Sequence, residues 1–67
     1  MEISARNQLP GTVTRVTMGT VMAEIALDVE GHEIVAAITR SSAERLGLEV
    51  GDRVTAYVKA TEVMIGR

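Results

Sequence analysis

The clearest pattern in the sequence is an alternation of apolar and other residues between Thr20 and Val29. Every second position in this stretch is apolar, namely Val21, Ala23, Ile25, Leu27 and Val29. Successive side chains of a β-strand point to opposite faces of its sheet, so this alternation predicts a strand with one buried face. Glu30-Gly31 supplies a tight turn, and a strand pattern resumes from His32 to Thr39, so the two segments predict a β-hairpin.

Further strands are predicted on both sides of this hairpin. The β-branched run from Gly11 to Thr17 predicts an earlier strand, and Asp52 to Ala60 predicts a later one. The inward positions of the later strand are Val54, Ala56 and Val58. A last short strand is predicted from Glu62 to Ile65.

One segment, Ser41 to Leu46, has the pattern of a short helix. Ser41 and Glu44 have the spacing of a capping box, which predicts Ser41 as the N-cap, and Gly47 predicts the C-cap. Gly51-Asp52 then predicts a turn before the next strand. The order of three strands, a short helix and two strands fits an all-β fold, a small five-stranded Greek-key barrel of the OB type, with residues 1–67 forming a single domain.

The composition indicates that this domain needs partners. A chain of 67 residues buries a small core, and with no cysteine and a single histidine it has neither disulfides nor a cysteine-based zinc site to stabilise it. Hydrophobic residues make up 46% of the chain, but Tyr57 is the only aromatic residue. Self-association is the remaining common source of stability, so we expect an oligomer.

The charge and the apolar runs restrict the possible partners. The net charge of −2 and the pI near 5.2 provide no long-range attraction to nucleic acid or to an anionic membrane surface. No apolar run approaches the length that spans a bilayer, and the N-terminus has no apolar signal core. We therefore expect a cytoplasmic protein that contacts neither nucleic acid nor membrane.

Residues suited to catalysis are scarce. The only histidine, His32, follows a tight turn, where an exposed polar residue is the usual finding. Glu24 and Asp28 lie on the polar face of a predicted strand, where solvation or cross-strand pairing accounts for them. The sequence therefore predicts no enzyme and no site that binds a metal through protein ligands.

Three polar features have the chemistry of an anion site, and each also has a simple structural explanation. Lys59 is the only lysine and lies near the end of a predicted strand, where it could equally be an edge residue. Arg6 belongs to a polar segment that could be a frayed terminus. Ser41 and Ser42 start the helix and could simply cap it. Together they supply a forked donor, a compact cation and short hydroxyls, which are the donors that a tetrahedral oxyanion requires.

Several motifs carry a resemblance to a known family. They are SARNQL at residues 4–9 followed by Gly11, Ile38-Thr39 with Ser42, RLGL at residues 45–48, the Gly51-Asp52 turn, and VKATEVMI at residues 58–65. Together they cover essentially the whole chain, which thereby resembles the Mop family of molybdate-binding proteins, the molbindins. This resemblance implies a five-stranded OB-like barrel that assembles as a homohexamer, a trimer of dimers, with oxyanions bound between subunits.

The resemblance also implies the residues of the site and its cargo. The residues carried over are Ser4, the Ala5 backbone, Arg6, Ser42, Lys59 and the Ala60 backbone. The implied function is reversible binding and storage of molybdate, with tungstate accepted because its charge and shape are similar. Pro10 stands where relatives often have a polar or basic residue, so extra charge near the pocket is not expected. A second class of site near the threefold axis cannot be assigned by motif.

Two other functions remain open from the residues alone. An OB-type barrel can bind single-stranded nucleic acid, but such surfaces use several aromatic residues and a basic groove. A purely structural oligomerisation module explains the apolar strands but leaves the SARNQ segment and Lys59 without a role. Salt-dependent retention of an oligonucleotide would indicate the first, and indifference to every oxyanion would indicate the second.

Overall fold

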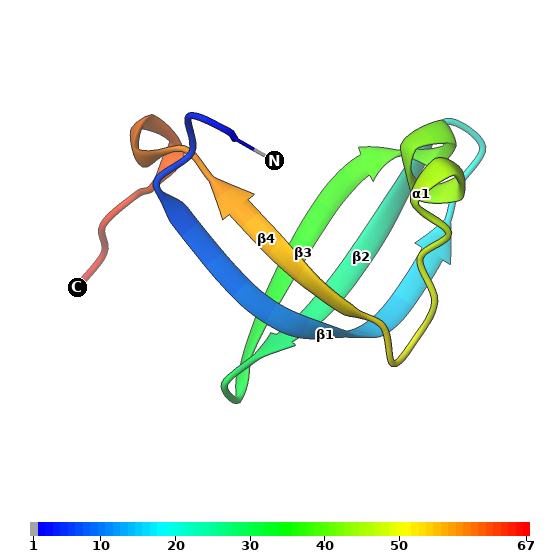
Figure 1. Ribbon diagram of the computed structural model, residues 1–67, viewed down its shortest axis with the longest axis horizontal. Coiled ribbons are helices and arrows are strands. Elements are labelled where there is room, and N and C mark those ends of the chain that lie inside the picture. Colours follow the sequence, from blue (N-terminus) through cyan, green and yellow to red (C-terminus); the bar gives the residue numbers. More distant parts are fainter. Residues whose placement is uncertain (1) are drawn as a thin grey trace.

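The computed structural model describes residues 2–67 and contains one antiparallel sheet, one short α-helix and one 3-10 turn (Figure 1). The elements in chain order are β1 (Asn7–Met18), β2 (Met22–Val29), β3 (His32–Thr39), α1 (Arg40–Leu46), β4 (Arg53–Val58) and the 3-10 turn η1 (Ala60–Glu62). The spatial order of the strands is β3-β2-β1-β4. The protein is therefore mostly β with one short helix, as the sequence predicted.

Strand β1 joins the two halves of this sheet. Its first half pairs with β4, from Asn7 opposite Val58 to Thr12 opposite Arg53, and its second half pairs with β2. A bulge between Val13 and Arg15 interrupts the second pairing, and bulges bend strands. We call residues 12–52 the body and residues 2–11 with 53–67 the arm.

The turn from arm to body requires a glycine. A Cβ built on Gly11 would lie 2.6 Å from the carbonyl oxygen of Asp28, closer than any real Cβ contact allows. Gly11 therefore lets β1 approach the end of β2 where the sheet changes direction. The predicted strand began at this glycine, whereas the observed strand begins at Asn7, so the polar hexad extends into the sheet.

The core lies almost entirely in the body. The buried residues that form it are Val13, Ala23, Ile25, Leu27 and Ala43. The alternation on β2 is confirmed at Ala23, Ile25 and Leu27, but Val21 and Ala26 differ from the prediction. Val21 precedes β2 and is 70% exposed, because it lies in the turn from β1. Ala26, on the other face, is fully buried: Arg15 is opposite it in register and reaches past it to Glu24, at 3.2 Å.

The predicted turns are confirmed. Glu30 and Gly31 both have positive φ, 49° and 86°, which is the conformation of a two-residue hairpin turn between β2 and β3. Gly47 ends α1 in the left-handed conformation, and its N–H donates to the last turn of the helix. Asp52 accepts a hydrogen bond from the Glu49 N–H at 2.9 Å and closes the turn before β4.

The predicted N-cap of the helix is wrong by two residues. Thr39 is the N-cap, because its hydroxyl accepts a hydrogen bond from the Ser42 N–H at 3.1 Å and its backbone is still extended. Strand β3 runs directly into α1, so the helix begins at Arg40. The Glu44 carboxylate does not cap the helix as predicted but lies 3.7 Å from Arg40, one helical turn earlier.

The predicted fifth strand and the closed barrel are not present within residues 2–67. Ala60–Glu62 form a 3-10 turn, closed by a hydrogen bond of 2.9 Å from the Glu62 N–H to the Lys59 carbonyl, and residues 63–67 have no regular structure. A strand forms only against a partner edge, and η1 turns the chain away from β4 at this point (Figure 1). The sheet of a single chain therefore stays open, with β3 and β4 as its edges.

Candidate functional site

The pairing of β1 with β4 brings two of the predicted site segments together at the end of the arm. Asn7 is opposite Val58, so the residues before Asn7 and after Val58 leave the sheet at the same place. The Asn7 side-chain amide also donates to the Val58 carbonyl at 3.0 Å. The segment with Ser4, Ala5 and Arg6 thus lies beside the segment with Lys59 and Ala60, although more than fifty residues separate them in sequence.

The charges at this end of the arm are exposed cations without partners. Arg6 and Lys59 are both exposed, and neither forms an ion pair with a carboxylate within residues 2–67. Ala5, in contrast, is only 5% exposed, so the backbone of the opening motif is anchored in the fold. A guanidinium, an ammonium and the Ser4 hydroxyl on these two adjoining segments are donors of the kind that a dianion requires.

Ser42 lies in a separate polar cluster at the start of α1. Its hydroxyl oxygen accepts hydrogen bonds from the Thr39 hydroxyl at 2.8 Å and from the Arg45 guanidinium at 3.1 Å. A serine hydroxyl accepts two hydrogen bonds and donates one, so its proton remains free to donate outward. The helix packs on β2 and β3, and this cluster therefore belongs to the body.

One chain does not bring Ser42 together with the other predicted site residues. Figure 1 shows α1 and η1 at opposite ends of the longest dimension of the molecule, which measures 33 Å. The single chain therefore contains two partial sites, one at the end of the arm and one on the helix. The intersubunit pocket stays a prediction, and it is the arrangement in which the two parts could meet.

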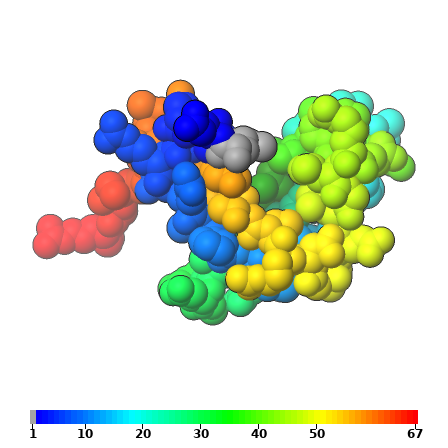
Figure 2. Space-filling model, in the orientation of Figure 1, coloured from blue at the N-terminus to red at the C-terminus, as the bar shows by residue number. Residues whose placement is uncertain are grey.

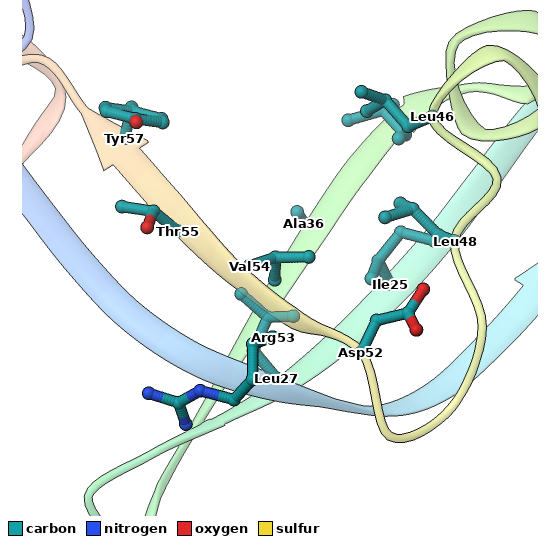
Figure 3. A pocket seen from close by; sticks show the side chains of 11 residues that line it. Ile25, Leu27, Ala36, Leu46, Leu48, Asp52, Arg53, Val54, Thr55 and Tyr57 are labelled. Atoms are coloured by element: carbon teal, nitrogen blue, oxygen red, sulfur yellow. The ribbon is translucent and has the colours of Figure 1, made fainter.

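A groove lies between the arm and the body, and Figure 2 shows the surface hollowed there. Its volume is about 550 Å³, and its walls are mainly apolar side chains of β2, β3 and β4 (Figure 3). None of the predicted site residues lines it. A more open depression beside the opening motif is lined by Glu2, Ile3, Ser4 and Gln8.

Other kinds of site have no support in the described part of the chain. His32 is exposed beside the β2–β3 turn, as predicted. Residues 2–67 contain no group of three or more His, Cys, Asp or Glu side chains that could hold a metal ion. No helix in this part of the chain is both long enough and apolar enough to cross a membrane.

Sequence reasoning missed three residues that organise these clusters. Thr39 and Arg45 both contact Ser42, and Asn7 joins the two segments of the arm. Arg45 follows Ser42 by three residues, a spacing that places two helical side chains on the same face. That spacing was a usable signal for Arg45, whereas the role of Asn7 depends on a pairing that only the fold defines.

Comparisons with known proteins identify the family of this chain. The TOBE domain model matches residues 3–65. Molybdenum-pterin-binding protein 2 of Clostridium pasteurianum is 47% identical over 66 residues, which cover 97% of each chain. The chain therefore belongs to the TOBE domain family, among the molybdenum-pterin-binding proteins. This confirms the resemblance seen in the SARNQL and KATEVM motifs, and the family is one of binding proteins rather than enzymes.

Solved structures show the same relationship. A molybdate-binding protein from Sporomusa ovata has a TM-score of 0.95 and 52% identity, with both chains covered completely. The cytoplasmic molybdate-binding protein ModG, solved with molybdate bound, has a TM-score of 0.83 and 39% identity, over 90% of this chain and 43% of the other. The similarity to solved structures therefore agrees with the family assignment.

Proposed function

We propose that this protein reversibly binds and stores molybdate at interfaces between its own copies. Tungstate is accepted as well, because it has the same charge and nearly the same shape. The whole chain acts as one domain, the assembly is a homohexamer built as a trimer of dimers, and it works in the cytoplasm. The ion is carried as an intact oxyanion, and no reaction is performed on it.

The observation that carries this proposal is the register of β1 against β4. Because Asn7 is opposite Val58, the segments that carry Arg6 and Lys59 leave the sheet at the same end, and neither side chain forms an ion pair with a carboxylate within residues 2–67. Two cations on adjoining segments repel each other, and a bound anion relieves that repulsion. Molybdate is a dianion near neutral pH, and one arginine with one lysine balances its charge.

The proposed site takes its residues from two copies. One copy supplies Ser4, the Ala5 and Ala60 backbones, Arg6 and Lys59, and a second copy supplies Ser42. This division follows from the distance between the two partial sites in one chain (Figure 1). The Ser42 hydroxyl suits its part, because Thr39 and Arg45 occupy its acceptor positions and leave its proton for the ion.

The strength and selectivity of the site follow from its donors. Each charge-assisted hydrogen bond contributes about 1.5–3 kcal/mol, so several converging donors reach the roughly 8 kcal/mol of micromolar affinity. An interface also excludes water, which strengthens these interactions. Sulfate has the same charge but is smaller, so donors that are spaced for molybdate leave it with longer hydrogen bonds.

The direct test is isothermal titration calorimetry of the ion-free protein with molybdate, and with sulfate as the matched control. We expect saturable heat at about one ion per chain with molybdate and weak or no heat with sulfate. Equal affinity for the two ions would contradict the proposed selectivity. No heat with either ion at several temperatures would favour a purely structural module, and salt-dependent retention of an oligonucleotide would favour a nucleic-acid binder.

A further inference from the structure

The two arginines of helix α1 differ in their surroundings. Arg40, at the start of the helix, lies 3.7 Å from the Glu44 carboxylate and donates to the Gly19 carbonyl at 3.2 Å, so its charge has a partner. Arg45, in the last turn, is exposed and forms no ion pair with a carboxylate within residues 2–67. Its guanidinium donates instead to the hydroxyl of Ser42. Arg45 is therefore held in place without a counter-charge.

The direction of the Arg45 side chain is informative. A cation in the last turn of a helix commonly interacts with the last carbonyl groups, where the helix dipole favours positive charge. The Arg45 side chain instead reaches back by three residues, and its Nη2 atom lies 3.1 Å from Ser42 Oγ. The positive charge of Arg45 is thus placed beside the one residue of the helix that was singled out for the oxyanion site.

The Ser42 hydroxyl is fixed by two donors. The Thr39 hydroxyl donates to Ser42 Oγ at 2.8 Å, and the same Thr39 oxygen accepts from the Ser42 N–H at 3.1 Å. Arg45 is the second donor to Ser42 Oγ. Because both lone pairs of this oxygen are occupied, its proton points away from Thr39 and Arg45. Loss of Arg45 would free one lone pair and let the hydroxyl rotate.

We propose that Arg45 is a positioning and specificity-determining residue of the oxyanion site. It does not contact the ion but acts through Ser42, whose hydroxyl it holds toward the ion, and it places a third positive charge one hydroxyl away. The inference rests on the proposed function, in which Ser42 of one copy meets Arg6 and Lys59 of another. The ligand class that three cations favour is the tetrahedral dianion, over a monoanion of the same shape.

The charge of Arg45 and its effect on the hydroxyl have different consequences. A fixed cation attracts a dianion with twice the energy with which it attracts a monoanion at the same place. An affinity depends exponentially on energy, so the factor gained by the dianion is the square of the factor gained by the monoanion. A reoriented hydroxyl, in contrast, changes the binding of both ions by similar factors. Two ions of one shape and different charge therefore separate the two effects.

The test compares molybdate with perrhenate, a tetrahedral monoanion of nearly the same size, by titration calorimetry. R45Q keeps an amide donor but loses the charge. We expect R45Q to bind molybdate about tenfold more weakly and perrhenate about threefold more weakly, so the preference for the dianion falls about threefold. R45K keeps the charge and should retain the wild-type ratio of the two affinities. Arg45 is exposed, so both variants should fold, which circular dichroism checks.

Two further variants serve as controls. R15Q removes the same charge from a part of the body that holds none of the proposed ligands, and we expect wild-type affinities for both ions. S42A removes the hydroxyl but leaves the charge of Arg45, so it should weaken both ions by the same factor. Where perrhenate binds too weakly to titrate, salt dependence replaces it. The molybdate affinity of R45Q should then fall less steeply with added sodium chloride than that of the wild type or R15Q.

The outcomes keep this inference apart from the proposed function. A wild type that binds no molybdate would overturn both. A wild type that binds molybdate, together with an R45Q variant of equal affinity, would overturn only the role of Arg45. Equal losses of molybdate and perrhenate affinity in R45Q, or an unchanged salt dependence, would also overturn it, because the charge of Arg45 would then not reach the ion.

Discussion

The body and the arm of this small protein differ in what their side chains do. The body contains the core cluster of Val13, Ala23, Ile25, Leu27 and Ala43, with α1 packed on β2 and β3. In the arm, only Ala5 and Gly11 are buried, while Arg6, Lys59 and the apolar residues 63–65 are exposed. The body therefore holds the core, although it also exposes Val21, Leu46 and Val50, whereas the arm has almost no buried side chain and exposes its cations and its apolar residues 63–65.

The region that holds the core and the region that carries the proposed site share a single strand, β1. Strand β1 belongs to both regions, so its second half is held by the core and its first half carries the charged motif outward. Because the two halves of β1 are one continuous strand, the half that is fixed in the body also fixes the position of the half that pairs with β4 in the arm. The body thus holds the strand that carries the exposed cation Arg6 and pairs with the strand before Lys59.

The largest effect is expected from a change inside the body. L27A removes a buried side chain from the core and should lower the free energy of unfolding by about 3 kcal/mol, a large share for a domain of this size. Urea unfolding followed by circular dichroism measures this change. V35A, on the outer face of β3, is the control and should cost less than about 1 kcal/mol. Equal losses would mean that the body is not the stabilising region.

The next effect should separate binding from folding in the arm. R6A removes the forked donor of the proposed site, and we expect about 100-fold weaker molybdate binding, or about 2.7 kcal/mol. Unfolding by urea should change little, because Arg6 is exposed and unpaired within residues 2–67. Titration calorimetry gives the affinity, and R15A, which removes a cation of the body paired with Glu24, is the control. Wild-type affinity in R6A would remove Arg6 from the site.

A smaller loss is expected at the second cation. K59A should weaken molybdate binding about tenfold, or about 1.4 kcal/mol, because a point charge makes fewer directed hydrogen bonds than a guanidinium. The oligomer should keep its mass, which sedimentation can measure. K59R retains the charge and should recover part of the affinity. If K59A binds as tightly as the wild type, the proposed site loses its second cation.

The same contrast explains which parts of the fold the sequence could predict. The body depends on local patterns, so the alternation on β2, the Glu30-Gly31 turn and the Gly47 cap were all visible. The burial of Ala26 was not visible, because Ala26 lies between Arg15 of β1 and Val35 of β3, and the sequence alone does not give those pairings. The fifth strand was predicted from residue types that favour strands, but a strand also needs a partner edge, and residues 2–67 place none beside residues 62–65.

The candidate site was predictable as chemistry but not as geometry. Arg6, Lys59 and Ser42 stood out by residue type and by motif, and they remain the proposed ligands. Their arrangement in two separate groups required the register between Asn7 and Val58 and the position of α1. The helix cap was misplaced for a related reason, because the strand before it supplies Thr39, and the helix pattern alone indicated Ser41.

The smallest effect tests that cap, the feature of the body nearest to Ser42. T39A removes the hydroxyl that accepts from the Ser42 N–H, and we expect a loss of about 1 kcal/mol in the free energy of unfolding. T39S keeps this hydroxyl and should recover most of the loss, while S41A should change little because Ser41 is not the cap. Urea unfolding of the three variants measures the differences. A larger loss in S41A than in T39A would restore Ser41 as the N-cap. Because Thr39 also donates to the Ser42 hydroxyl at 2.8 Å, T39A should weaken molybdate binding through the body alone, with the cations of the arm untouched.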